Sequence, residues 1–348
     1  MRAIIMTSYD PLKFKGGTEK IVLHTRDLLR EEGFQVDIFH KDNTQKVGDY
    51  FPYWIGRHAH SCGEKYDLAV INNIAGLGFF PGKARRTVAV FHMLYLAFSH
   101  IMRGYENFED YIGNAYLNGY ISEVFVGNAA NRLIAVSESV KEEIEKYMGV
   151  EKDIIVVHNP VMHQFSPMEK LKARSVFNIP KDAFVGLYVG RNDYTKGYDI
   201  FREVVSYTYR DIFWVQVISS GGLNTLPVLK DITTFKEVPF ENMPLIYNLA
   251  DFLLFPSRYE GFGLSIVEAL ACGIPVITAK VGVAKELGNF LDGLLIESLD
   301  IKDILERIRI LKQYRCIREY YKIYVTNEIS RRFSLISWRE NMKKALLS

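Results

Sequence analysis

The chain has 348 residues, of which 48% are hydrophobic and 24% charged, with a formal net charge of +2 at pH 7. This length predicts two domains, and the composition is typical of a globular protein that buries a sizeable core. The nearly balanced charge, without a Lys/Arg-rich run, disfavours a nucleic-acid partner, and no apolar run approaches the roughly 18 residues of a membrane span.

Short apolar runs alternate with amphipathic stretches along the whole chain. We expect strands at 3–8, 36–40, 67–73, 87–92, 132–136 and 154–157 in the first half, and at 184–189, 213–218, 235–238, 252–255, 275–278 and 293–296 in the second. Apolar strands separated by helices predict parallel sheets that are covered on both faces. The long segment 93–131 is expected to be helical and rich in aromatic residues. The pattern therefore predicts two doubly wound α/β domains.

The segment 158–183 separates the two sets of strands. It carries three prolines and shows no strand pattern. We therefore place a domain boundary near residue 165, with one domain at 1–165 and a second at 166–330. Two such domains facing each other would leave a cleft, which is the usual place for a ligand.

Two features of the first domain lie at the ends of predicted strands. Gly16 and Gly17, in FKGGTEKIV (14–22), form a loop ahead of a helix and suit a phosphate or another close ligand, although ordinary loops contain such pairs too. The loop is neither GxGxxG nor GxxxxGK[ST], so the fingerprints of dinucleotide folds and P-loop NTPases are missing. His92 ends the strand at 87–92, where it suits a catalytic role, whereas a lone histidine is more often structural.

The first motif of the second domain is a basic loop, GRNDYTKG (190–197), directly after the strand expected at 184–189. Gly190 permits a sharp turn after the strand, and Lys196 is expected to open the next helix. Two cations, Arg191 and Lys196, at the carboxyl end of a strand suit a diphosphate, since Arg binds oxygen in a bidentate way and Lys adds a point charge. The alternative is a pair of solvated surface cations.

The stretch PSRYEGFGLSIVEALACGIPVI (256–277) places two glutamates beside a glycine-rich turn. Gly261 and Gly263 permit close backbone approach, and a helix expected from about Leu264 points free N–H groups at the same place, which favours phosphate. Glu260 in the turn and Glu268 in the helix suit the paired hydroxyls of a sugar or a ribose. The alternative, a capping glutamate plus a surface glutamate, is disfavoured by the apolar residues around Glu268.

Several chemistries lack their motifs. The chain contains no DxD, no HExxH and no His/Cys cluster, so neither a metal nor another cofactor is expected, and no GxSxG indicates a serine hydrolase. The three cysteines, Cys62, Cys272 and Cys316, form no CxxC pair and no disulfide framework. With no signal-peptide h-region, this favours a reducing compartment, so we expect a cytoplasmic protein.

Taken together, these motifs resemble the family 4 glycosyltransferases, whose fold is GT-B, and the likeness extends over most of the chain. EGFGLSIVE (260–268) matches the family's E-x7-E motif, GRNDYTKG its phosphate loop and GGTEKIV (16–22) its N-terminal Gly-Gly loop. RLIAVSESVKEEI (132–144) and VVHNPV (156–161) match two further stretches. FSLISW (333–338) resembles the start of the last helix, which in this fold crosses back to the first domain, so we expect 331–348 to make that return.

The resemblance implies a retaining hexosyltransferase that needs no metal and uses a nucleotide sugar as co-substrate, with a UDP-sugar favoured. The acceptor would be a glycan or a lipid-linked glycan. Glu260 would contact hydroxyls of the donor sugar, Glu268 the ribose, and Arg191 and Lys196 the diphosphate. The implied donor pocket consists of Gly16, Gly17, Gly190, Arg191, Lys196, Glu260, Gly261, Phe262, Gly263, Leu264 and Glu268. The residues implied in catalysis are His92, Arg191, Lys196 and Glu260.

Some features leave alternatives open. VISSGG (217–222) replaces the family's commoner Gly-x-Gly, which leaves the choice among UDP, GDP and ADP open. A GT-B relative with another reaction, such as an epimerase, and an inactive nucleotide-sugar-binding subunit are the competing functions. Scattered basic residues in the first domain are compatible with peripheral contact at the inner face of a membrane, although no polybasic cluster demands it. These residues are Lys13, Lys15, Arg57, Arg85, Arg86 and Arg103.

Overall fold

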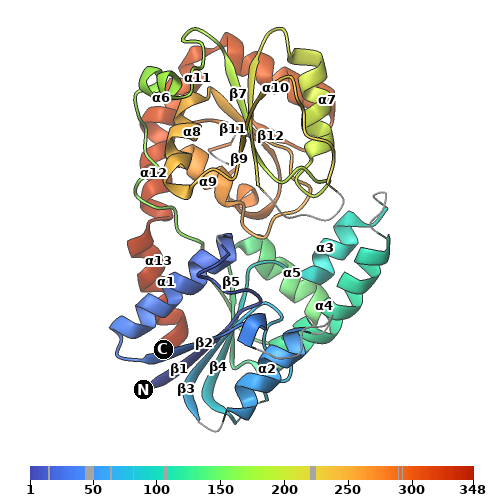
Figure 1. Ribbon diagram of the computed structural model, residues 1–348, viewed down its shortest axis with the longest axis vertical. Coiled ribbons are helices and arrows are strands. Elements are labelled where there is room, and N and C mark those ends of the chain that lie inside the picture. The colour runs from blue at the N-terminus through green and yellow to red at the C-terminus, as the bar shows by residue number, and fades with distance from the viewer. Residues whose placement is uncertain are drawn as a thin grey trace. The chain divides into compact units, whose positions relative to one another are not determined.

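The computed structural model describes residues 1–14, 16–43, 51–62, 65–80, 82–104, 109–219, 225–288, 290–291 and 293–348, with only the backbone described for 109–118. This part of the chain divides into two compact units (Figure 1). The N-terminal unit comprises Met1–Asn159 with Trp338–Ser348, and the C-terminal unit comprises Pro160–Ser337. The division after Asn159 lies a few residues before the boundary expected near residue 165.

The N-terminal unit is built on a six-stranded parallel sheet in the order β2-β1-β3-β4-β5-β6. The strands are β1 (Arg2–Met6), β2 (Gln35–Phe39), β3 (Tyr66–Asn72), β4 (Ala84–Phe91), β5 (Arg132–Ala135) and β6 (Ile154–Val156). The helices are α1 (Gly17–Glu31), α2 (Phe51–Ser61), α3 (Tyr95–Met102), α4 (Glu109–Ala129) and α5 (Glu138–Met148), with a 3₁₀ turn η1 (Lys41–Asn43). The central strands are buried along nearly their whole length, as parallel strands covered on both faces require.

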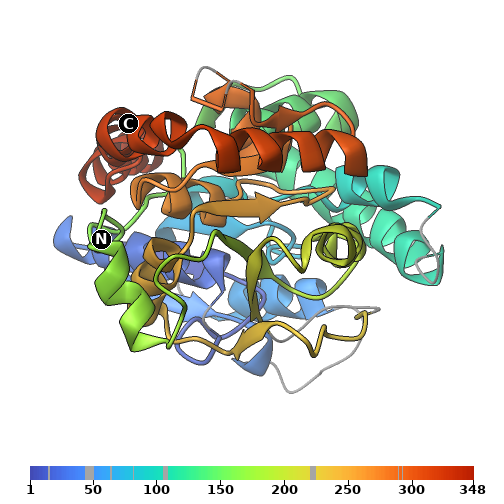
Figure 2. The ribbon, with the colours of Figure 1, turned by 90° about the horizontal axis from the view of Figure 1, so that it is seen from above.

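The C-terminal unit has a second six-stranded parallel sheet, in the order β12-β11-β10-β7-β8-β9. Its strands are β7 (Val185–Gly190), β8 (Phe213–Ile218), β9 (Thr233–Lys236), β10 (Phe252–Phe255), β11 (Val276–Ala279) and β12 (Leu295–Ile296). Its helices are α6 (Lys170–Val176), α7 (Tyr198–Thr208), α8 (Met243–Leu249), α9 (Leu264–Ala271), α10 (Ile301–Gln313), α11 (Arg315–Tyr320) and α12 (Thr326–Arg332). Shorter turns are η2 (Phe240–Asn242), η3 (Gly282–Leu287) and the π-helical η4 (Tyr321–Val325). Figure 2 shows the same ribbon from above, with the last helices of the chain in red.

The predicted fold class is confirmed, because both sheets are parallel and all the expected strands are present within a few residues of their expected bounds. The segment 93–131 forms α3 and α4, as its composition indicated, with 105–108 outside the described residues. Within the described residues, no helix combines the length and the apolar character that a membrane span requires.

The last helix, α13 (Leu335–Leu347), contributes to the N-terminal unit from Trp338 onward. The Trp338 side chain is buried there and lies 5.9 Å from the His24 ring. Arg132 donates to the Ala345 carbonyl at 2.9 Å and Arg86 to the Leu346 carbonyl at 3.2 Å, which ties the end of the chain to β4 and β5. Arg86, one of the basic residues considered for membrane contact, is thus committed to this junction.

Candidate active site

Strands β7 and β10 are parallel neighbours in the C-terminal sheet, with Leu253 paired to Leu187, so their carboxyl ends lie side by side. From β7 the chain continues to β8 on one side, and from β10 it continues to β11 on the other. Such a reversal of strand order is the place where open α/β sheets bind their ligands. The two loops predicted to hold a donor, 190–197 and 256–264, begin at these two strand ends.

The loop after β7 is shaped by Asp193, which is 2% exposed. Its carboxylate accepts from the backbone N–H of Lys196 at 3.0 Å and from Nε of Arg191 at 2.6 Å. The expectation that Lys196 opens the next helix is wrong, because α7 begins at Tyr198 and Lys196 lies in the turn that Asp193 closes. Gly197 ends this turn with φ at +64°, and a Cβ there would lie 1.9 Å from the Pro256 carbonyl oxygen. Glycine is therefore required at 197 by both conformation and space.

Arg258 fastens the loop after β10 onto the loop after β7. Its backbone N–H donates to the Thr195 carbonyl at 2.8 Å, and its guanidinium donates to the Tyr194 carbonyl at 2.7 Å. The same guanidinium binds the Asp199 carboxylate in a bidentate way, with both hydrogen bonds at 2.7 Å. A bidentate pair fixes orientation as well as distance, so the two loops are held in one register.

Lys196 and Glu260 form an ion pair between the two loops, with 2.5 Å between Nζ and Oε1. Ser257 Oγ donates to the same oxygen at 2.7 Å. The side chains of Lys196 and Glu260 are only 19% and 10% exposed, so each depends on the other for compensation of its charge. The structure thus brings together two residues that are 64 positions apart in the sequence.

Arg191 is the second predicted phosphate ligand, and its side chain also has an acidic partner, Asp193. Burial disfavours its charge, but the carboxylates of Asp193 and Glu260 outweigh this cost and raise the pKa of Arg191. Both predicted cations are therefore paired rather than solvated. The alternative of two solvated surface cations does not describe this loop.

The turn Gly261–Leu264 leads directly into α9, which starts at Leu264 as expected. Gly263 caps the helix in a left-handed conformation, with φ at +92°. The carbonyl oxygen of Phe262 accepts from the Val283 N–H at 2.8 Å, so η3 supports the turn from its other side. The N-terminus of α9 carries backbone N–H groups beside the Lys196–Glu260 pair, an arrangement that favours an anion.

Glu268 lies within α9 and is half-buried. Its Oε2 accepts from the Tyr247 hydroxyl at 2.8 Å, which orients the carboxylate. Burial of Tyr247 and, next, the neighbouring Glu268 raise the pKa of that phenol, so it stays a donor. Glu268 is therefore a positioned carboxylate rather than a surface side chain.

His92 directly follows β4 in the N-terminal unit and is buried. Its Nε2 lies 2.9 Å from Asn72 Oδ1, and its backbone N–H donates to Asn73 Oδ1 at 2.7 Å. Because the Asn72 amide nitrogen donates to the Met6 carbonyl, its oxygen is the acceptor, and we assign the proton of the imidazole to Nε2. Burial lowers the pKa of His92 to about 4, so the ring is neutral at pH 7.

The Gly-Gly loop lies at the start of α1, with Gly16 as the N-cap and Gly17 as the first helical residue. A Cβ at Gly16 would lie 2.3 Å from Oε2 of Glu19, which is the flexible end of a side chain. Burial raises the pKa of Glu19. Gly16, Gly17 and His92 thus follow β1 and β4 of the N-terminal sheet, whereas the other predicted site residues all belong to the C-terminal unit.

Four residues that position the site were not predicted as part of it: Asp193, Ser257, Arg258 and Tyr247. An aspartate three residues before Lys196 is a known turn signal, so Asp193 could have been found from the sequence. Arg258 and Tyr247 act across long separations and left no local signal. Of VISSGG, the part from residue 220 onward lies outside the described residues.

The described residues contain one group with the spacing of metal ligands, formed by Asp10, His40 and Asp42. Lys13 Nζ lies 3.6 Å from Asp10 and 3.4 Å from Asp42, so an ammonium already supplies positive charge there. None of the three was among the predicted site residues. The expectation that no metal or other cofactor is needed stays a prediction.

Comparison with known proteins matches each of the two units to a glycosyltransferase family model. The family model described as "Glycosyltransferase Family 4" matches residues 15–165, and the one described as "Glycosyl transferases group 1" matches residues 169–327. Both models describe glycosyltransferases, and together they cover the two doubly wound units of this chain. Within that class, the chain belongs to the family 4 glycosyltransferases.

Two curated relatives are D-inositol 3-phosphate glycosyltransferases. The one from Mycolicibacterium smegmatis is 30% identical over 54% of this chain and 46% of its own length. The one from Catenulispora acidiphila is 32% identical over 53% of this chain and 49% of its own length. The match thus spans about half the length of these relatives.

Solved structures share the fold along the whole chain. Sucrose-phosphate synthase from Thermosynechococcus elongatus has a TM-score of 0.78 at 18% identity, covering 99% of this chain and 97% of its own. HepE from Anabaena, in complex with UDP and glucose, has a TM-score of 0.73 at 17% identity, covering 100% of this chain and 99% of its own. At these identities the likeness concerns the GT-B fold alone.

Proposed function

We propose that this protein is a retaining hexosyltransferase that moves a hexose from a nucleotide diphosphate sugar to a glycan or lipid-linked glycan acceptor without a metal. The observation that carries the proposal is the Lys196–Glu260 ion pair at the strand switch, beside Arg191 and the N-terminus of α9. Cations, backbone N–H groups and carboxylates that lie together suit a ligand that joins a diphosphate to sugar hydroxyls.

In this assignment Arg191 and Lys196 hold the diphosphate. When the bond between the anomeric carbon and the phosphate oxygen breaks, negative charge collects on the β-phosphate. Fixed cations and the helix N-terminus stabilise that charge without having to reorganise. The acceptor oxygen then bonds to the anomeric carbon on the same face, and its proton passes to the departing phosphate oxygen.

Glu260 would bind the donor sugar through its second oxygen. Oε1 already accepts from Lys196 and Ser257, whereas Oε2 has no hydrogen-bond partner within the described part of the chain. An ionised carboxylate oxygen in this position accepts well from a sugar hydroxyl. The ion pair and the Ser257 hydrogen bond hold the open oxygen in place.

Glu268 would accept from the ribose hydroxyls, because Tyr247 orients its carboxylate at the start of the donor pocket. A UDP-sugar is the favoured donor, and the Anabaena relative of the same fold was solved with UDP and glucose. His92 would act as a neutral hydrogen-bonding group rather than as a proton donor, since its pKa lies near 4. Its Nδ1 is buried and has no partner within the described residues.

The experiment is a donor screen with the purified protein. We would incubate it with UDP-, GDP- and ADP-sugars in excess EDTA, measuring thermal stabilisation and the slow release of free nucleotide. Selective stabilisation by one donor, with nucleotide release that is lost in Lys196→Ala and kept in the exposed control Lys172→Ala, is the expected result. Stabilisation without nucleotide release, with or without an acceptor, would favour the inactive binding subunit. No stabilisation by any donor would refute the donor site.

A further inference from the structure

A second polar site lies in the C-terminal unit, at the edge of the sheet opposite to the donor loops. Ala183 and Phe184 precede β7, Asp251 precedes β10, and Gly273–Pro275 precede β11, and all of these line one cavity of about 450 Å³. This volume suits a small molecule. The donor loops leave the carboxyl ends of β7 and β10, so this cavity is a separate site.

The cavity is strongly cationic. Seven lysine and arginine side chains line it, against three carboxylates, those of Asp182, Asp251 and Glu319. The whole chain, in contrast, has a formal net charge of only +2. An excess of positive charge in one concave site attracts anions.

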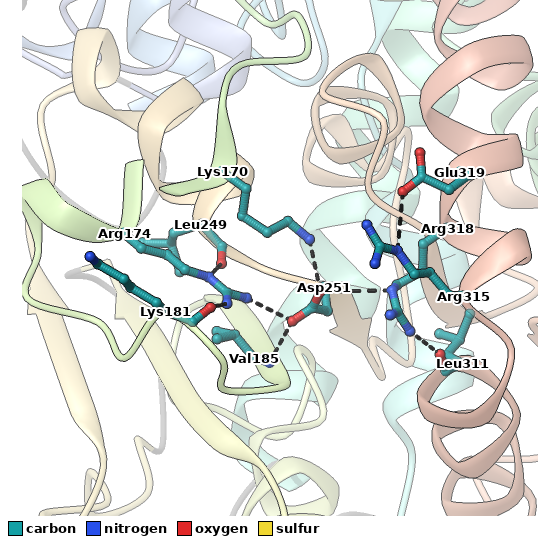
Figure 3. A network of polar contacts seen from close by, with 10 residues as sticks. All are labelled: Lys170, Arg174, Lys181, Val185, Leu249, Asp251, Leu311, Arg315, Arg318 and Glu319. Carbon is teal, nitrogen blue, oxygen red and sulfur yellow. Dashed lines mark hydrogen bonds and ion pairs between the residues drawn. The ribbon is translucent and has the colours of Figure 1, made fainter. Parts of the chain in front are cut away.

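Asp251 forms the floor of the cavity and is shared by three cations (Figure 3). Its two oxygens lie 2.8 Å from Lys170 Nζ and 2.8 Å from Arg174 Nη2, and Arg318 Nε lies 3.7 Å away. The Val185 N–H also donates to it at 2.8 Å. With the Arg174 and Asp251 side chains only 4% and 9% exposed, this network is a built part of the fold rather than a chance surface contact.

The electrostatics of the floor agree with an unbalanced positive charge. Burial lowers the pKa of Lys170, and the charges of Arg174 and Arg318 lower it further, although Asp251 acts in the opposite direction. Burial is thus the main cause of the shift, and three cations share one carboxylate at this place. A bound anion would relieve this repulsion.

The rim of the cavity offers ammonium groups that are not engaged. Lys181 and Lys322 line it from opposite segments of the chain, and neither side chain has an ion pair or hydrogen bond within the described residues. Arg315 lies 3.6 Å from Glu319, whereas Lys312 donates to the Asp211 carbonyl at 3.2 Å. A concave site with a buried ionic floor and open cations at its rim fits a small polyvalent oxyanion.

We propose that this cavity binds a small soluble anion that carries phosphate, such as pyrophosphate or a sugar phosphate, at a site distinct from the donor loops. Lys181, Lys322 and Arg315 would contact the phosphate oxygens, with the Asp251 network as the floor. The concave shape favours a small molecule over the flat surface of a membrane.

Lysine footprinting on the intact protein tests the proposal directly. Acetylation of each lysine would be measured by mass spectrometry with and without inorganic pyrophosphate, at constant ionic strength. We expect protection of Lys181 and Lys322 but not of the exposed controls Lys172 and Lys236 in the same unit. Protection of Lys196 reports the donor loops separately, so failure of one site is distinguishable from failure of the other.

A pair of matched double variants completes the test by calorimetry. Replacing Lys181 and Lys322 by alanine should weaken pyrophosphate binding at the cavity by about tenfold or more, because two cations near the anion are lost. Replacing Lys172 and Lys236 by alanine removes the same charge and should leave binding unchanged. Equal protection of all four lysines, no protection, or equal binding by the two double variants would each overturn the proposal.

Discussion

The pair formed by Lys196 and Glu260 allows stability and catalysis to be separated by experiment. In Lys196→Ala, the Glu260 carboxylate keeps only Ser257 as a partner while it remains 10% exposed. Removing one member of a fully buried ion pair costs about 3–5 kcal/mol. Because both side chains retain some contact with solvent, we expect a loss of about 2 kcal/mol in the free energy of unfolding.

The double variant Lys196→Ala/Glu260→Ala should recover part of that stability, since no uncompensated carboxylate is left behind. Its transferase activity should not recover. Loss of a group that stabilises charge in the transition state lowers kcat by about 100- to 1,000-fold, and the double variant lacks it too. Urea unfolding of the wild-type protein, both single variants and the double variant gives the coupling energy of the pair, and initial rates on the same proteins give the catalytic effect.

Two results would refute this reasoning. If Lys196→Ala transfers sugar at the wild-type rate, the ammonium has no role in stabilising the leaving diphosphate. If the double variant is less stable than Lys196→Ala by the full effect of Glu260→Ala, the two side chains do not depend on each other, and the pair is not the unit that holds the loops.

Three further predictions concern the site and its supports. Glu268→Gln should weaken nucleotide binding by about fivefold to tenfold in calorimetry, since an accepting carboxylate oxygen becomes a weaker amide partner, and unchanged affinity would remove its ribose role. Burial lowers the pKa of His92 from 6.5 to about 4, so the stability that the neutral ring confers is complete above pH 6.5 and falls by about 3 kcal/mol as the pH drops to 4. His92→Gln should lose less stability over this pH interval in urea unfolding. Equal losses in the two proteins would contradict the argument from burial. Gly197→Ala should lower the free energy of unfolding by at least about 3 kcal/mol, because its Cβ would lie 1.9 Å from the Pro256 carbonyl oxygen. The control Gly149→Ala, at φ +61° with nothing within 4 Å of its Cβ, should cost only about 1 kcal/mol. Similar losses in thermal unfolding would show that the close approach to Pro256 is not the cause.

The sheets could be predicted from the sequence because parallel strands covered on both faces are apolar along their length, which is a local signal. The start of α9 at Leu264 was also predictable from a local signal, because glycines directly precede an apolar helix. The start of α7 was not, because it depends on the Asp193 side chain closing the turn and on the approach of Gly197 to Pro256.

The structure brings together the predicted site residues of the C-terminal unit, in a charge arrangement that the sequence did not predict. Arg191 and Lys196 suggested two open cations, whereas each is paired with a carboxylate, and Glu260 comes from a loop 64 positions away from Lys196. The cationic cavity left no sequence signal at all. Its lining comes from segments between Met168 and Lys322 that no periodic pattern connects, and the whole-chain charge conceals it.

The place of α13 in the N-terminal unit has a consequence for folding during synthesis. Trp338–Ser348 completes the N-terminal unit, and the carbonyl groups of Ala345 and Leu346 satisfy Arg132 and Arg86 there. The ribosome makes these residues only after all of Pro160–Ser337, a delay of roughly ten to forty seconds at about 5–20 residues per second. The N-terminal unit therefore starts to emerge before the C-terminal unit and is completed after it. A nascent chain that stalls in the C-terminal unit leaves both arginines and the Trp338 site uncovered, and it should be the form on which chaperones and proteases act.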